Sequence, residues 1–440
     1  MDDRSDQMIL CAALMHGVGM HLGAWQVRDG EASDYVSPEY FMELARVAEA
    51  AKLHAVFFAD GLGNHEEGTD RPCGALDPTA ILTLMGAVTS RLGLVATAST
   101  TYNDPYTLAR RFGSIDHLSH GRAGWNSVAT FNPAAATQFG GGGLPNHADR
   151  YARAEEFIDV VLALWDSWEE GALVGDQANS VFARPDLVHD INHAGQRFQV
   201  KGPLPFPRVP QGRPVIFQAG ASEEGREQAA KYADVVFTAQ HLLDGAIEFR
   251  ADMLRRAARY DRQLKVLPGM FIHVGATHAE AEARCQRLDD ALGTGPELQK
   301  LARRTGVPVG ALELDEKFPV HLLGPDEEFA GSVGFRRTLV NLAVKEDLTV
   351  RRLLVRYGGG HHRVIGTPAE IADIMQEWTE AGAADGFNLM VDVLPSGLRD
   401  IGTLLVPELQ RRGMFHQDYE HETLRANLGL GAVARAAVPA

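Results

Sequence analysis

The segment Pro214–Asp234 combines residue types that could bind a phosphate monoester. Its apolar run Val215–Phe217 is typical of a buried strand, and the chain then turns through Gly220, Ala221 and Ser222 into a predicted helix. The first turn of a helix has backbone N–H groups without partners, and the helix dipole favours an anion there. Gly220 would let the backbone approach a ligand, and Ser222 adds a hydroxyl. An ordinary strand-to-helix turn has a similar pattern, so phosphate binding is one of two interpretations.

Polar side chains also follow other predicted strands. Asp60 ends an apolar run, and a carboxylate at the carboxyl end of a barrel strand is more often functional than structural. Asn126 is followed by Thr130; asparagine is uncommon in strands, and its amide could either contact a heterocycle or cap the strand. Ser99 lies in Thr97–Thr101, where small side chains would admit a flat ligand, although ordinary strand-end residues are the simpler interpretation of that run.

Two further pairs could contribute to a site. His147 and Tyr151 are four residues apart at the start of a predicted helix, so they would share a face if the helix begins early enough. Donors there would add to an anion site, although a capped surface helix explains them equally. His21 and Trp25 follow the first predicted strand, where they either line a pocket or belong to a packed loop.

Neither a dinucleotide site nor a metal centre is predicted. Gly17, Gly19 and Gly23 follow the first strand, but no helical pattern begins until Pro38, whereas a dinucleotide fingerprint opens a helix inside the motif. The adjacent histidines His361-His362 would point apart, and no third ligand is spaced nearby. The glycines before them suggest a mobile loop instead.

These candidates must be positioned by a repeated alternation of strands and helices. Apolar runs predict strands at Met8–Met15, Ala55–Ala59, Leu92–Ala98, Arg122–Val128, Pro214–Gln218, Asp234–Thr238, Leu267–Val274 and Gly386–Val391. Helices are predicted at Pro38–Lys52, Asp77–Ser90, Tyr106–Leu118, Asp149–Trp168, Glu223–Tyr232, Leu242–Tyr260, His278–Leu292 and Pro368–Ala381, three of them with a capping residue before proline. The alternation predicts an α/β fold, a closed (β/α)8 TIM barrel; a doubly wound open sheet is the alternative.

Three segments exceed a minimal barrel. We interpret Gly171–Arg213 and Gly293–Thr349 as insertions and Pro395–Ala440 as a carboxyl-terminal arm on a single domain that spans residues 1–440. Long insertions in a barrel are usually lids or interface elements, and the sequence leaves both interpretations open for 293–349.

Composition excludes several classes of function. The 440 residues are 45% hydrophobic and 23% charged, with a formal net charge of −16, which argues against nucleic-acid binding. No stretch approaches the roughly 18 apolar residues of a membrane helix, and the polar amino terminus is unlike a signal peptide. Cys11, Cys73 and Cys285 are odd in number and far apart, which predicts reduced thiols in a cytoplasmic protein without membrane attachment.

An ordered set of stretches runs through most of the chain: GAWQ (Gly23–Gln26), FFADGL (Phe57–Leu62), LDPTAILTLMGAVTSRLGL (Leu76–Leu94), TYNDPYTLARRFGSIDHLSHGRAGWNSVAT (Thr101–Thr130), HADRYARAEEFIDVVLALWDSW (His147–Trp168), HAGQRFQVKGPL (His193–Leu204), QAGASEEGR (Gln218–Arg226), AADGFNL (Ala383–Leu389) and LVPELQRRGMFHQDYEHETLRANLGL (Leu405–Leu430). This set resembles the nitrilotriacetate and dibenzothiophene-sulfone monooxygenase group of the bacterial-luciferase-like flavin monooxygenases. Single pieces are weak, but the ordered set is highly specific.

The resemblance implies a luciferase-like TIM barrel that assembles as a homodimer or homotetramer. It also implies an FMN-dependent monooxygenase of a two-component system, in which a separate flavin reductase supplies reduced FMN. The reduced flavin reacts with O2 to give a C4a-peroxide that oxygenates a small organic substrate. The matching motif positions imply flavin-ring or ribityl contacts at Asp60, Ser99, Asn126 and Thr130, phosphate contacts at His147, Tyr151, Ala221 and Ser222, and substrate-side residues at His21, Phe57 and Trp25.

The chain departs from the group in two places. Ala221-Ser222 stands where relatives often carry Ser-Ser or Leu-Ser, and Arg304-Thr305-Gly306 stands where sulfone-type relatives carry His-Thr-Gly. The second difference falls in the insertion expected to form a substrate wall, so the sequence does not identify the substrate. The alternatives are an enzyme of the same fold that cleaves a flavin as its substrate, a flavin carrier without turnover, and a non-oxygenating flavin or deazaflavin dehydrogenase.

Overall fold

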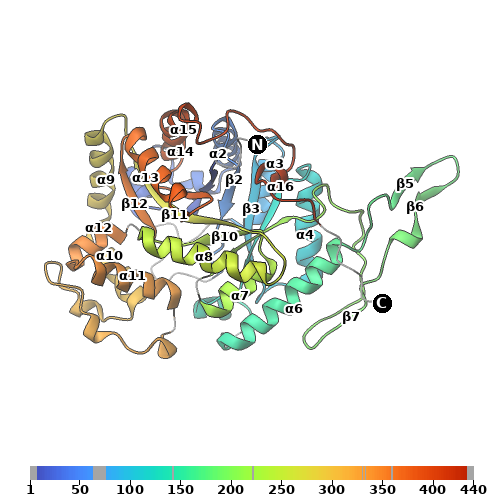
Figure 1. Ribbon diagram of the computed structural model, residues 1–440, viewed down its shortest axis with the longest axis horizontal. Helices are drawn as coiled ribbons and strands as arrows, with labels where there is room; N and C mark the ends of the chain where they lie inside the picture. The colour runs from blue at the N-terminus through green and yellow to red at the C-terminus, as the bar shows by residue number, and fades with distance from the viewer. Residues whose placement is uncertain are drawn as a thin grey trace.

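Eight parallel strands close into a barrel in the computed structural model, and helices surround it (Figure 1). The structure describes residues 7–62, 76–140, 143–220, 222–329, 331, 333–357 and 360–433. The barrel strands are β1 (Ile9–Ala13), β2 (Ala55–Phe58), β3 (Gly93–Ser99), β4 (Ala123–Val128), β9 (Val215–Ala219), β10 (Val235–Thr238), β11 (Lys265–Val274) and β13 (Gly386–Val391). Each overlaps a strand predicted from the sequence, so the TIM-barrel prediction is confirmed.

The ring closes through β11, which pairs with two neighbours in succession. Residues 265–268 of β11 pair with β10, and residues 269–272 pair with β13. A further parallel strand, β12 (His362–Gly366), pairs with residues 270–274 and so continues beside β11 where β10 has ended. Strand β12 was not predicted from the sequence, because its apolar run is only Val364-Ile365 and follows three glycines, two histidines and an arginine, a composition typical of a loop.

The outer helices are α2 (Pro38–Ala50), α3 (Pro78–Gly86), α4 (Pro105–Leu118), α6 (His147–Trp165), α7 (Glu223–Tyr232), α8 (Leu243–Ala258), α9 (His278–Leu292) and α13 (Pro368–Glu380). The predicted caps are confirmed: Ser37 and Asp77 accept backbone N–H groups at the starts of α2 and α3. Thr367 forms a reciprocal capping box with Glu370 at the start of α13. Within the described part of the chain, no helix is long and apolar enough to cross a membrane.

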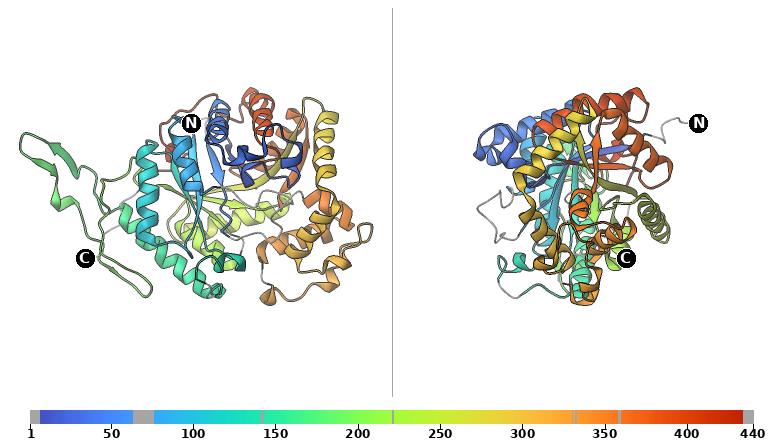
Figure 2. Two further views of the ribbon diagram at one scale, coloured as in Figure 1. Left: turned by 180° about the vertical axis from the view of Figure 1, so that it is seen from behind. Right: turned by 90° about the vertical axis from the view of Figure 1, so that its left-hand side faces the viewer.

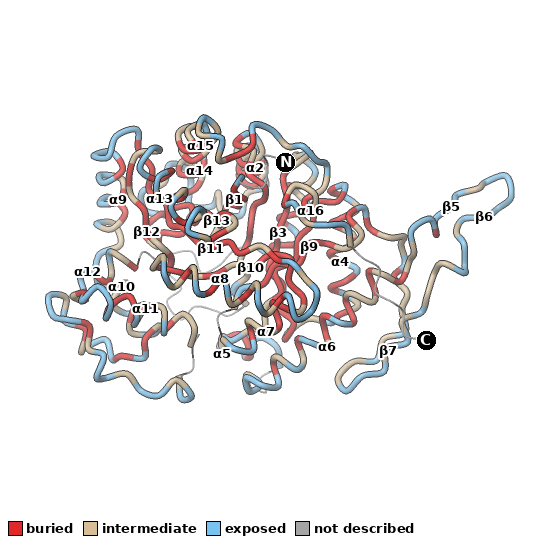
Figure 3. Tube along the Cα trace, in the orientation of Figure 1, coloured by how far each residue is buried: buried red, intermediate tan, exposed pale blue. Residues whose placement is uncertain are grey.

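The two insertions extend from opposite sides of the barrel (Figures 1 and 2). The first contains the exposed hairpin of β5 (Leu173–Asp176) and β6 (Val181–Ala183) and the short pair β7 (His193–Ala194) and β8 (Gln199–Val200); Figure 3 shows how little of the hairpin is buried. The second, here called the lid segment, contains α10 (Thr294–Thr305), α11 (Val333–Lys345) and α12 (Val350–Tyr357), and has its own apolar core. It continues through α12, beyond the expected boundary at Thr349.

The carboxyl-terminal arm closes the amino-terminal end of the barrel. It contains α14 (Ser396–Asp400), α15 (Val406–Arg411) and α16 (Leu424–Asn427). Leu424 and Leu428 pack into the barrel interior among inward-facing residues such as Val95. Gly93 makes room for this contact, because a Cβ there would lie 2.4 Å from Leu424 Cδ1. The arm therefore fills the bottom of the barrel and leaves the carboxyl ends of the strands at the other end.

Candidate functional site

The amino terminus of α7 carries the predicted phosphate contacts. Ser222 caps this helix, its Oγ accepting the N–H of Gly225 at 3.1 Å. The Tyr151 hydroxyl lies 3.3 Å from the same oxygen. Because α6 begins at His147, His147 and Tyr151 share a face, with ring centroids 4.8 Å apart. Side chains from the first turns of two helices thus meet beyond the end of β9.

Glycine at position 225 is part of this arrangement. A Cβ there would lie 3.0 Å from the Tyr151 hydroxyl and 3.1 Å from Ser222 Oγ, so a larger residue would crowd both. The Glu224 carboxylate is 3.8 Å from His147 Nδ1, and both side chains are about half exposed. Ala221, the fourth expected phosphate contact, lies outside the described residues.

The ends of β3 and β4 bring together the residues expected to contact the flavin ring. Ser99 Oγ and Thr130 Oγ1 are 2.7 Å apart. Asn126 Nδ2 donates to Thr97 Oγ1 at 2.8 Å, whereas its buried Oδ1 has no hydrogen-bond partner among the described residues. Leaving a buried acceptor unpaired costs about 1–3 kcal/mol. Asn126 is therefore suited to a ligand that presents an N–H or O–H donor.

Asp60 directly follows β2 and is half-buried. Burial raises the pKa of its carboxyl to about 6, and the charge of Asp77 contributes in the same direction. A carboxyl with a pKa near 6 carries a mixture of protonated and ionised forms near neutral pH. Perturbed groups of this kind are more common at functional sites than elsewhere, which agrees with the position of Asp60 at the carboxyl end of a barrel strand.

His21 is buried and held by two hydrogen bonds. Gly23 N–H donates to Nδ1 at 3.1 Å, so the ring proton of the neutral tautomer is on Nε2, which lies 3.0 Å from Asp289 Oδ1. Arg363 on β12 donates to both oxygens of Asp289 at 2.9 and 3.0 Å. Burial would raise the pKa of Asp289, but the hydrogen bond from His21 and the charge of Arg363 lower it to about 2. The imidazole is therefore fixed in both orientation and tautomer.

The same network continues to the end of β13. Arg363 Nε donates to Nε2 of His273 at 3.2 Å, and His273 Nδ1 lies 3.1 Å from Asp392 Oδ2. Arg284 makes a bidentate contact with Asp392 at 2.5 and 2.9 Å. This network was not predicted from the sequence, although Asp392 directly follows a predicted strand just as Asp60 does. Its position at the end of a barrel strand marks Asp392 as a candidate, but the sequence does not indicate its partners.

The other two residues expected on the substrate side, Phe57 and Trp25, lie in different surroundings. Phe57 faces the barrel interior, with its ring 6.1 Å from that of Phe217 and 5.6 Å from that of Phe237. Trp25 lies on the short helix α1 (Ala24–Val27) and is 38% exposed. Strand residues alternate, so the next residue, Phe58, points outward into the core beneath the helices.

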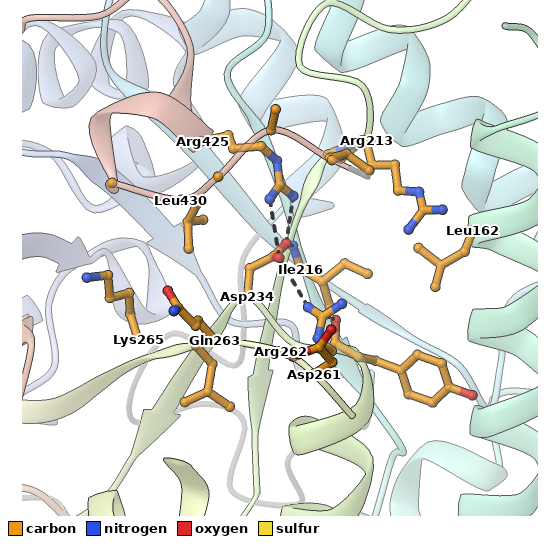
Figure 4. Close-up of a pocket in the computed structure, with 17 residues that line it drawn as sticks. Leu162, Arg213, Ile216, Asp234, Asp261, Arg262, Gln263, Lys265, Arg425 and Leu430 are labelled. Carbon is orange, nitrogen blue, oxygen red and sulfur yellow. Dashed lines mark hydrogen bonds and ion pairs between the residues drawn. The ribbon is translucent and has the colours of Figure 1, made fainter. Parts of the chain in front are cut away.

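A cavity of about 420 Å³ lies at the opposite, amino-terminal end of the barrel (Figure 4). Arg425 of the arm donates to both oxygens of Asp234 at 2.8 and 3.3 Å, and Arg262 donates to the same carboxylate at 3.3 Å. These ion pairs join α16 to the start of β10. The cavity thus lies between the arm and the barrel, far along the strands from Asn126 and Asp392. Separately, no group of three or more His, Cys, Asp or Glu side chains in the described part of the chain is arranged to hold a metal ion.

Comparison with known proteins gives consistent matches over nearly the whole chain. The family model described as luciferase-like monooxygenase matches residues 18–385. Nitrilotriacetate monooxygenase component A of Aminobacter aminovorans is 42% identical, over 94% of both chains. N-acetyl-S-(2-succino)cysteine monooxygenase of Bacillus subtilis (strain 168) is 39% identical, over 96% of this chain and 97% of the relative. A riboflavin lyase, solved with modified FMN and the substrate riboflavin, is 28% identical with a TM-score of 0.83, covering 97% of this chain and 96% of that structure.

Proposed function

The chain belongs to the luciferase-like monooxygenase family and is an oxidoreductase that incorporates oxygen; on that premise we propose that it uses reduced FMN and O2 to oxygenate a small organic substrate. The observation that carries the FMN assignment is the meeting of Tyr151 and Ser222 at the amino terminus of α7. Two hydroxyls and a helix terminus in one place are suited to a phosphate monoester.

The residues present fit FMN along its whole length. Ser222, Tyr151 and His147, with the neighbouring Ala221, would hold the phosphate. Ser99, Asn126, Thr130 and Asp60 would contact the ring or the ribityl chain, and the unpaired Oδ1 of Asn126 supplies an acceptor there. When bound, the reduced flavin supplies the electrons with which O2 is activated.

The chain itself would orient the reactants and exclude water. The rings of Phe57, Phe217 and Phe237 make the interior beneath the strand ends apolar. Activated oxygen is wasted when water reaches it, so a dry site favours transfer to the substrate. We assign the fixed imidazole of His21 to the substrate side, where its Nε2–H is held by Asp289. We assign Trp25 to the outer edge of the same site. The lid segment is the element best situated to close over the site.

The proposed reaction requires a partner, because two electrons must reach FMN. We infer that a separate flavin reductase supplies reduced FMN, either in transient contact or by diffusion. The name component A of the nitrilotriacetate relative describes one part of a larger system, and two further relatives are named as different subunits of one enzyme, pristinamycin IIA synthase. A homodimer or homotetramer is the assembly that we propose for this chain.

A second candidate is cleavage of a flavin as the substrate. The similarity to a riboflavin lyase supports it, because that structure has the same fold and nearly the same length. In this alternative the phosphate contacts would still bind FMN, so flavin binding alone does not separate the two functions. Recovery of the intact flavin after turnover does separate them.

We expect Ser222→Ala and Tyr151→Phe each to weaken FMN binding about 10- to 100-fold, since a hydrogen bond to a charged group contributes about 1.5–3 kcal/mol. Riboflavin lacks the phosphate, so its affinity should change little. Anaerobic titration of each variant with both reduced flavins measures this difference.

The matched control is Ser37→Ala, which removes the same kind of helix cap from α2, away from the proposed site. It should leave both affinities unchanged. Equal losses of FMN and riboflavin affinity in the Ser222 and Tyr151 variants would show that these residues do not bind the phosphate.

A further inference from the structure

Two buried histidines lie where the lid segment meets the barrel. His241 follows β10 and His361 precedes β12; they are only 2% and 6% exposed. The ring of His361 stacks on Phe237, with centroids 5.3 Å apart and planes inclined by 30°. Gly269 on β11 admits this ring, because a Cβ there would lie 2.2 Å from His361 Nδ1. His361 therefore lines the interior of the barrel near the carboxyl ends of the strands, beside the cluster of aromatic rings that contains Phe57 and Phe237.

Both histidines have buried nitrogens without partners. Neither Nδ1 nor Nε2 of His241, nor Nδ1 of His361, has a hydrogen-bond partner among the described residues. Burial lowers the pKa of His241, and it lowers that of His361 to about 3 with help from the charges of Arg304 and Lys300. Both rings are therefore neutral at pH 7, and each has one N–H donor and one acceptor. Buried polar atoms in folded proteins are nearly always paired, so these nitrogens point to a ligand that is polar.

Cationic side chains surround the two rings. The Arg304 guanidinium of α10 lies over the rings of Phe335, at 4.3 Å, and Tyr357, at 5.3 Å. It is also close to the backbone before His361, since a Cβ at Gly360 would lie 2.5 Å from Arg304 Nη1. Arginine that stacks on aromatic rings presents its N–H donors in the plane of the guanidinium, a geometry that suits a planar oxyanion.

Among the residues that the structure describes here, few acidic groups offset this charge. Lys300 is buried on the same helix as Arg304. Glu346 makes two hydrogen bonds with Arg356, both 3.1 Å, so this acid is paired within the lid segment. Glu297, in the first turn of α10, is the carboxylate whose charge acts on Tyr357. The region between α10 and β12, here called the seam, contains Arg304, Lys300, His241 and His361. It is thus polar, buried and on balance positive.

We propose that the substrate of this enzyme carries a carboxylate, and that this group binds in the seam between α10 and β12. Arg304 supplies the positive charge, and His361 and His241 supply N–H donors. Phe335 and Tyr357 of the lid segment lie against His361 and His241, with ring centroids 6.4 and 6.0 Å apart, so the ligand enters as the lid segment moves away from β12. The reacting part of the molecule then lies over Phe237 and Phe57, on the side of His21. This inference rests on the proposed function, since it names the substrate class of the same site.

The test is calorimetric titration of the full-length protein, saturated with FMN and kept without reductase so that no turnover occurs. The probes are nitrilotriacetate and N-acetyl-S-(2-succino)cysteine, each compared with the neutral amide of the same skeleton. At least one carboxylate should bind, and its amide at least about tenfold more weakly. Arg304→Gln should weaken the carboxylate about 10- to 100-fold and change the amide little, whereas Arg304→Lys should retain part of the affinity. His361→Phe keeps the stacking and removes the donor, so it too should weaken only the carboxylate.

Arg303→Gln, on the exposed side of the same helix, is the matched control and should have no effect. Circular dichroism and FMN affinity identify any variant that fails to fold. Equal affinity for acid and amide, equal losses of both in Arg304→Gln, or no binding of any probe would overturn the inference. Failure of the proposed function is distinguishable when the titration is repeated without FMN: carboxylate binding by a protein that never binds FMN would refute the flavin assignment and leave the carboxylate site standing.

Discussion

Replacing Asp392 with asparagine is expected to lower the free energy of unfolding by about 3 kcal/mol. Removing one partner of a buried ion pair costs about 3–5 kcal/mol, because the other partner keeps its charge without compensation. Asp392 is fully buried and contacts both Arg284 and His273. The lower end of the range applies because Asp400 still pairs with Arg284, at 2.6 Å. Urea-induced unfolding at pH 7 measures the loss.

The same variant has a distinct pH dependence. Burial would raise the pKa of Asp392, but His273 and Arg284 hold it well below the ordinary value. A depressed pKa contributes stability that is fully present above the unfolded pKa of about 3.9 and is lost as the pH falls further. The difference between wild type and Asp392→Asn should therefore be complete above about pH 5 and should shrink below pH 4. Asp315→Asn, which removes an exposed partner of Arg351, should have no measurable effect at either pH. A difference that does not vary with pH would contradict the assignment.

The second large effect is expected at the other end of the barrel. Leu424→Ala should cost about 2–5 kcal/mol of stability, because it opens a cavity where a fully buried leucine fills the barrel. FMN affinity should stay within a few-fold of wild type, since the arm closes the end of the barrel opposite the proposed flavin site.

Thermal unfolding and flavin titration of the same preparation test both statements. Leu118→Ala is the control, because Leu118 is 66% exposed and its truncation leaves no buried cavity. If Leu424→Ala reduced FMN binding as much as stability, the separation between the structural and functional ends of the barrel would be wrong.

Sequence alone was sufficient for the barrel because its elements have local signals. Each barrel strand is an apolar run between helices. Capping residues such as Ser37 and Thr367 lie directly before a proline, and in the structure each of them caps its helix. The shared face of His147 and Tyr151 also followed from spacing, once the helix was found to begin at His147.

What the sequence did not reveal depends on contacts between distant segments. The network from His21 to Asp392 joins a loop, α9, β11 and β12, and no spacing along the chain indicates that Asp289 and Arg363 meet. His361 was interpreted as part of a mobile loop, yet it stacks on Phe237, which is more than one hundred residues earlier in the chain. Its role becomes visible only when β12 pairs beside β11 and places it above Gly269.

We propose that this chain transfers one oxygen atom from O2 to an organic molecule by means of reduced FMN. The most direct measurement supplies chemically reduced FMN under ¹⁸O2, without a reductase, together with nitrilotriacetate or N-acetyl-S-(2-succino)cysteine. Carbonyl products are trapped at once so that their oxygen does not exchange with water. We expect one ¹⁸O atom in each molecule of the trapped carbonyl product, and FMN recovered intact. Cleaved flavin, or a carbonyl product without ¹⁸O, would contradict the proposed function.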